Sequence, residues 1–154
     1  MKRLLSLTVS ALLVCVAVSA FAVDAVPTPA NVIQGPSAVT NYGILGGTVE
    51  RGDVVVVDST GIRRADNLLS AATARPVGIA IDGGVAGNSI AYVTVDPAFT
   101  PGFVVTAGTV YVLSVNGLMS PAADATTGDY MAIIGVGTTG NKLVLRPFSW
   151  GVKR

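Results

Sequence analysis

The chain contains no histidine, and its single cysteine, Cys15, lies near the start of its 154 residues. Without histidine the protein lacks the usual general base at neutral pH, the commonest zinc ligand and the base of a Ser-His-Asp triad. One cysteine forms neither an internal disulfide nor a structural zinc site. We therefore expect no catalytic residue, no bound metal and no cofactor, and the sequence predicts a protein that is not an enzyme.

Charged residues are also scarce, at 12% of the sequence, and the net charge is only +1. A net charge this small favours neither nucleic acid nor an anionic membrane surface as a partner. Eight of the nine acidic residues are aspartates, and most stand at predicted turns, where aspartate usually bonds its own backbone. They are poor candidates for the paired carboxylates of a hydrolase, and the DxDxDG-like spacing of a calcium loop does not occur.

Two short motifs have known functions in other settings. Residues 135–140 spell GxGxxG, but a dinucleotide fingerprint must open a helix, whereas here a strand-like run follows at 142–145. Arg51-Gly52-Asp53 is a tripeptide that integrin receptors recognise, yet it stands where a turn leads into a run of valines. We interpret both motifs as turns of a β structure.

Residues 1–22 have the features of a secretory signal. Lys2 and Arg3 supply the positive start, a mostly apolar run follows, and Ala20 and Ala22 give the small-x-small pattern of a cleavage site. The sequence therefore predicts cleavage after Ala22, which removes the cysteine from the mature chain. An uncleaved membrane anchor and an N-terminal core helix are the alternatives, and membrane contact is expected only if residues 1–22 are retained.

Beyond this segment the composition predicts an extended arm, a β domain and a short basic tail. The arm, residues 23–37, holds three prolines among small residues and is typical of a tether rather than a packed element. The β domain spans residues 38–150, and residues 151–154 form the tail. Residues 66–74 are short and rich in alanine, and they are the one plausible helical turn of the domain.

The β domain contains an internal repeat, in which a pattern of strand-like runs and turns occurs twice. Its glycine anchors keep a nearly constant spacing: Gly61 and Gly117 are 56 residues apart, and Gly78 and Gly135 are 57 residues apart. Each copy is too short to be stable singly, so the two are expected to share one core. The two copies span about 46–96 and 107–148.

These features predict an all-β fold in which duplicated β-hairpin units form one small sandwich or barrel. Residues 90–95 have the period of a strand, and the Asn-Gly and Gly-Asn pairs at 116–117 and 140–141 suit tight hairpins. Pro97 and Pro101 are expected to break the chain between the repeats. The expected core consists of Val55, Val57, Ile79, Ile90, Val110, Val112, Ile134, Leu143 and Leu145.

Several stretches combine a glycine before a strand, a Val-Gly-Ile-Ala strand and a closing Leu-Val-Leu: 49–55, 75–80, 107–114, 116–118, 134–137 and 142–145. In this they resemble small β proteins of tailed-phage particles, in the group of head-decoration (capsid cement) and virion-appendage proteins. The resemblance covers most of the β domain. It implies a structural protein on a virion surface, bound as an oligomer, often a trimer, to the major capsid protein or another virion protein.

Two functions therefore compete. The first is a non-enzymatic virion protein that decorates or stabilises a capsid or an appendage. The second, favoured by the signal-like start, is an exported bacterial cell-surface or matrix protein that uses the same architecture for adhesion. Either function requires an assembly surface, for which Phe148 and Trp150 near the C terminus are the candidate residues. The alternative for these two aromatic residues is that they close the core.

Overall fold

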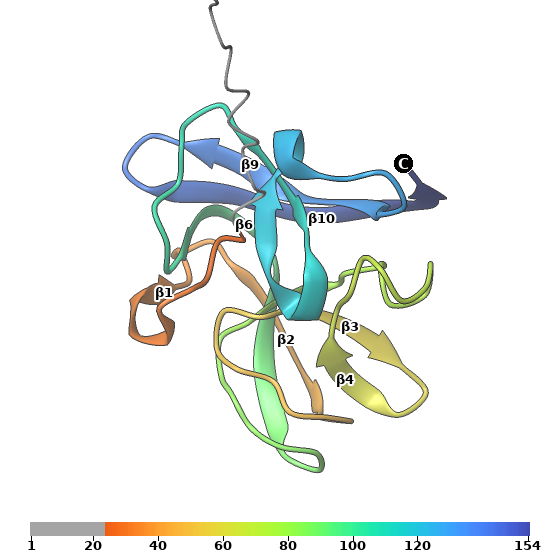
Figure 1. Ribbon diagram of the computed structural model, residues 1–154. Coiled ribbons are helices and arrows are strands. Elements are labelled where there is room, and N and C mark those ends of the chain that lie inside the picture. The colour runs from red at the N-terminus through yellow and green to blue at the C-terminus, as the bar shows by residue number, and fades with distance from the viewer. Residues whose placement is uncertain (1–23) are drawn as a thin grey trace, which may run out of the picture.

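The computed structural model describes residues 24–154 (Figure 1), and the all-β prediction is confirmed. One antiparallel sheet curls into a half-barrel. The signal predicted at residues 1–22 lies outside the described residues. Among residues 24–154, no helix is long and apolar enough to cross a membrane. The strands are β1 (Val32–Ile33), β2 (Val39–Ile44), β3 (Val54–Asp58), β4 (Gly61–Arg64), β5 (Gly78–Ala80), β6 (Ser89–Pro101), β7 (Val110–Leu113), β8 (Met119–Pro121), β9 (Tyr130–Thr138) and β10 (Lys142–Lys153).

The main path of the sheet runs β4-β3-β5-β6-β10-β9-β7-β8, with β1 and β2 paired to β6. The two halves of the path have the same arrangement: outward from the central β6–β10 pair, each half places its fourth, third, first and second main-path strand in that order. The strands β6, β5, β3 and β4 occupy the same places in the first half as β10, β9, β7 and β8 do in the second. In Figure 1 the second half, ending in the blue β9–β10 hairpin, lies above the yellow β3 and β4 of the first.

The two halves share their register as well as their strand order. Val55 pairs with Gly78 in the first half, and Tyr111 pairs with Gly135 in the second. These pairs are related by the same spacings of 56 and 57 residues that appear in the sequence. The glycines stand at equivalent sites because a neighbouring strand approaches closely there. A Cβ atom would meet the carbonyl oxygen of a β6 residue at Gly78 and of a β10 residue at Gly135.

The turns that lead into β3 and β7 are also held alike. The Gly52 N–H donates to the carbonyl of Ala80 at 2.8 Å, and the Gly108 N–H donates to the carbonyl of Gly137 at 2.8 Å. Both Gly52 and Gly108 have positive φ, at 99° and 80°, which glycine adopts without strain. The Arg-Gly-Asp tripeptide therefore occupies a structural turn that has a counterpart in the second half.

Buried side chains form two clusters. The larger one draws on both halves and includes Phe99, Ile134 and Leu145, all with no exposed area. The smaller one lies within the first half and includes Leu45 and Ile62. The single cluster that joins the two halves explains why neither copy of the pattern needs to be stable alone.

The expected core is confirmed at seven of nine positions and is wrong at Val57, whose side chain is 48% exposed. Val54 and Val56 enter the larger cluster and Val55 the smaller one, so β3 is buried on both faces. Val57 lies past the end of both clusters. Val110 is only partly buried, because it is the first residue of β7.

The sequence predicts that Pro97 breaks the chain between the repeats, and at Pro97 this prediction is wrong. β6 runs through it as a strand of 13 residues. The strand changes partners at this point: Val95 still pairs with β2, whereas Asp96 pairs with Leu145 of β10. The register of β6 against β10 also shifts there, and a proline, which has no N–H to donate, is tolerated at such an irregularity.

The arm is extended, but the prediction that it is an unpacked tether is wrong. Ala25 forms a bridge with Met119 at the outer edge of β8, and β1 pairs with the end of β6. Val32 of β1 has no exposed area and belongs to the larger cluster. The arm therefore pairs with Met119 of the edge strand β8, whose carbonyl accepts a hydrogen bond from the Ala25 N–H.

Residues 66–74 form turns rather than the expected helical segment. The Asp66 carboxylate accepts hydrogen bonds from the N–H groups of Leu68 and Leu69, and Ser70 and Thr73 bond each other through their side chains. Side chains that satisfy nearby backbone groups in this way compete with helix formation. Helical turns occur elsewhere in the described residues as three short 3-10 helices, η1 (Pro29–Asn31), η2 (Val115–Gly117) and η3 (Ala122–Asp124).

Candidate functional site

The outer face of β10 carries a row of exposed side chains, which we name the β10 stripe. Alternate residues of a strand point to opposite faces of the sheet. Leu143 and Leu145 point into the larger cluster and have no exposed area. The pairing of β10 with β9 shifts register between Leu145 and Phe148 and again between Ser149 and Lys153, but the even-numbered residues from 144 to 152 are all exposed. The β10 stripe consists of Val144, Arg146, Phe148, Trp150 and Val152.

The two aromatic residues of the stripe do not close the core. Phe148 is 52% exposed and Trp150 is 57% exposed. Their rings pack edge to face, with centroids 4.8 Å apart and planes at 88°. This arrangement fixes both side chains on the surface, so little of their conformational freedom remains to be lost on binding a partner.

The exposed apolar surface continues onto the neighbouring strand β9. Val136, 39% exposed, pairs with Val144, and the partly buried Ile133 pairs with Phe148. Paired residues lie on the same face of an antiparallel sheet. The stripe and its β9 neighbours therefore place several exposed apolar side chains on one side of the sheet, around the exposed Arg146. Apolar patches on soluble proteins mark interaction sites.

Positive charges accompany this surface. Arg146 lies within the stripe itself and is exposed. Near the C terminus, the Lys153 ammonium lies 4.9 Å from the ring centroid of Tyr130, and Arg154 donates to the carbonyl of Ala125. Lys153 and Arg154 are thus held against their own chain, whereas Arg146 makes no hydrogen bond or ion pair among the described residues.

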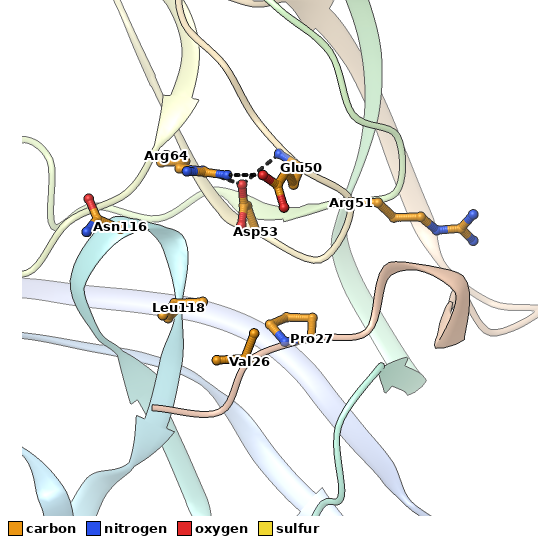
Figure 2. Close-up of a pocket in the computed structure, with 8 residues that line it drawn as sticks. All are labelled: Val26, Pro27, Glu50, Arg51, Asp53, Arg64, Asn116 and Leu118. Carbon is orange, nitrogen blue, oxygen red and sulfur yellow. Dashed lines mark hydrogen bonds and ion pairs between the residues drawn. The ribbon is translucent and has the colours of Figure 1, made fainter. Parts of the chain in front are cut away.

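A second candidate site is a hollow of about 250 Å³ between the arm, the turn before β3 and the β7–β8 connection. Figure 2 shows Asp53 at its centre, with Val26, Pro27 and Leu118 on the facing side. The Asp53 carboxylate accepts hydrogen bonds from the Glu50 N–H at 2.7 Å and from Arg64 Nε at 2.5 Å. The hollow therefore holds an ion pair whose partners are already engaged.

Burial raises the pKa of the Asp53 carboxyl, although the Glu50 N–H and the Arg64 guanidinium oppose this shift. Burial also lowers the pKa of Arg64, but the hydrogen bond and charge of Asp53 outweigh it and raise that pKa. The pair is ionised at neutral pH, because arginine keeps its proton and Arg64 Nε lies 2.5 Å from the Asp53 carboxylate.

The same geometry places the Arg-Gly-Asp tripeptide in the framework of the protein. Asp53 is only 6% exposed, and the Arg51 side chain points away from it and donates to the carbonyl of Val32 at 2.6 Å. The two charged groups are thus not presented together to a receptor. The GxGxxG run ends in the hairpin between β9 and β10, where Gly140 and Asn141 have positive φ and no helix follows.

Replacing Asp53 with alanine is expected to lower the free energy of unfolding by about 2 kcal/mol, because the Glu50 N–H and Arg64 lose their acceptor. The loss stays below that of a fully buried pair, since the Arg64 side chain is 34% exposed. Urea unfolding at pH 7 measures it. Asp58→Ala is the matched control: Asp58 ends β3 as a solvent-exposed carboxylate whose pKa is lowered by hydrogen bonds from Thr60, and because water can replace those bonds its loss should lower the midpoint much less than the loss of Asp53. Equal midpoints for both variants would contradict this role for Asp53.

Among the described residues, no group of three or more histidine, cysteine, aspartate or glutamate side chains is placed to hold a metal ion. No protein-family model, curated protein or solved structure matches the chain. The site must therefore be interpreted from its own geometry.

Phe148 and Trp150 were identified from the sequence, whereas Val144, Arg146 and Val152 were not. The signal that identifies them is the alternation of less exposed and more exposed residues that begins at Leu143 and ends at Val152. It becomes visible once the buried leucines fix which face of the strand is internal.

Proposed function

We propose that this protein is a non-enzymatic structural protein of a virion surface, where it decorates or stabilises a capsid or an appendage as an oligomer. The observation that carries the proposal is the β10 stripe. It leaves two aromatic rings that pack edge to face, and two valines, exposed on the sheet. Burying such side chains supplies most of the binding energy at many protein interfaces.

The form of this surface supports a protein partner over a small ligand. Small molecules usually bind in concave pockets that enclose most of their surface. The stripe instead runs along the outer face of one strand and continues onto its neighbour. A surface of this kind fits the major capsid protein, another virion protein or a further copy of this chain.

The resemblance of residues 39–150 to head-decoration and appendage proteins supports the virion as the location. The signal-like residues 1–22 support the alternative, an exported bacterial cell-surface or matrix protein. The β10 stripe would serve adhesion or self-assembly equally well in that case. The two functions differ in where the protein is found and in where its chain begins.

Fractionation of producing cells tests the proposal. Phage particles, cell envelopes and culture medium are separated on a density gradient, and the protein in each fraction is quantified and its N terminus sequenced. On a virion surface the chain should sediment with particles in a fixed ratio to the major capsid protein. Recovery only in envelope or medium, with Val23 as the first residue, would overturn the virion proposal in favour of export.

A further inference from the structure

Arg146 and Trp150 stand at equal distances in the sequence on either side of Phe148 in the β10 stripe. Val144 and Val152 stand at its ends, and Phe148 stands at its centre. Arg146 and Trp150 lie one step to either side of Phe148, and a guanidinium and an indole ring are a favourable pair, because the cation is attracted to the face of the ring. The stripe is therefore complementary to its own reverse.

We propose that the β10 stripe pairs with the stripe of a second copy of this chain about a two-fold axis through Phe148. This inference rests on the proposed assembly function and names its first contact. Face-to-face packing in opposite directions places Phe148 against Phe148 of the partner subunit. It also places Arg146 of each copy over the partner's Trp150. An isologous contact of this kind uses the same patch on both copies and closes as a dimer.

The area of the surface suits this partner. Each aromatic side chain offers up to about 150–250 Å² for burial, and Phe148 and Trp150 are both more than half exposed. With the valines of the stripe and Val136 on β9, each copy contributes on the order of 500 Å² of apolar surface. Two copies together therefore bury on the order of 1,000 Å², near the lower limit for a specific interface.

The position of the charge also agrees with self-pairing. Arg146 and its symmetry mate stand two residues from the axis on opposite sides. Along the strand direction they are about 13 Å apart, more than the Debye length of about 8 Å at physiological ionic strength. The two like charges therefore repel weakly, while each is free to stack on an indole ring. The two-fold stripe makes a dimer the building unit, in place of the trimer that the resemblance implies.

Sedimentation equilibrium of the native protein, purified with the N terminus that the cell leaves on it, tests the inference. The wild type should be a dimer. Trp150→Ala should raise the dimer dissociation constant at least about 30-fold, and Phe148→Asp should give a folded monomer, because it places two carboxylates at the axis. Tyr42→Ala is the matched control: it removes an aromatic side chain that is 75% exposed on β2, away from the stripe, and should leave the dimer unchanged.

A double-mutant cycle identifies the contact itself. Within one chain Arg146 and Trp150 are both neighbours of Phe148 in the stripe, so the same cycle measured on the free energy of unfolding of the monomer subtracts any coupling inside the chain. Arg146→Ala should weaken the dimer in the wild type and have little further effect in Trp150→Ala. Additive effects, a monomeric wild type or a trimer that these variants leave intact would each overturn the inference. Circular dichroism confirms that each variant remains folded.

The two proposals fail in different ways. A dimer that obeys the cycle but never sediments with particles retains the pairing and removes the virion function. A protein that is found on particles but is a monomer in solution retains the virion function and removes the pairing.

Discussion

Gly135→Ala and Gly78→Ala are each expected to lower the free energy of unfolding by about 3 kcal/mol. At both positions the new Cβ atom would collide with a backbone carbonyl of the adjacent strand, that of Val144 for Gly135 and that of Val93 for Gly78. A backbone oxygen inside a paired sheet cannot move aside without breaking the register of its strand, so the strain is not relieved by side-chain motion.

Chemical denaturation of the two variants measures this effect, and the equality of the two losses is the informative result. Gly47→Ala is the control, because a Cβ atom there meets only the Arg63 side chain at 3.9 Å, an ordinary contact distance. Its stability should stay within about 0.5 kcal/mol of the wild type. Near-normal stability of either Gly78→Ala or Gly135→Ala would show that the two halves do not share the close approach described for them.

Phe99→Ala is expected to cost about 3–5 kcal/mol, the range found when a buried phenylalanine is truncated to alanine. Phe99 has no exposed area, belongs to the cluster that draws on both halves, and pairs through its backbone with Leu143 of β10. Its removal leaves a cavity where the first half meets the second. The effect should therefore weaken the whole protein in a single transition.

Thermal and urea unfolding, followed by circular dichroism and tryptophan fluorescence together, test this expectation. Trp150 reports on the second half when the protein is dilute enough to be monomeric, while circular dichroism reports on all strands. Val104→Ala is the control, since Val104 is 85% exposed and its truncation should change stability by less than about 0.5 kcal/mol. Separate transitions for the two probes in the wild type would contradict one shared core.

Turn chemistry was the part of the fold that the sequence specified best. Asn116, Gly117, Gly140 and Asn141 all have positive φ, as expected of hairpin residues, because asparagine and glycine tolerate this conformation. The requirement is local, so it can be recognised in a few residues. The all-β class follows from many such turns between short β-branched runs.

Predictions that depended on distant parts of the chain were less successful. The run of four valines at 54–57 cannot show which residues meet which cluster, and so Val57 was wrongly placed in the core. Val32 is buried only because β1 reaches the end of β6, almost 70 residues later in the sequence. Pro97 is accommodated because β6 changes partners there, which no local pattern indicates.

The candidate site likewise has one part that the sequence predicts and one part that depends on the fold. The aromatic residues Phe148 and Trp150 stand out in a chain with few aromatics, so composition alone is enough to single them out. Their exposure, and the role of Arg146 between them and Val144, depend on which face of β10 the two buried leucines occupy. The symmetry of the stripe becomes meaningful only after that face is known.

The measurement that tests the assembly function most directly is binding to particles that lack the protein. Particles produced without the gene are mixed with purified wild type, Phe148→Asp or Tyr42→Ala, and bound protein is quantified after density-gradient sedimentation. The wild type and Tyr42→Ala should bind to saturation at a fixed number of copies per particle, whereas Phe148→Asp should remain at the top of the gradient. Equal binding by Phe148→Asp, or no binding by the wild type, would contradict the claim that this protein assembles on a virion as an oligomer formed through the outer face of β10.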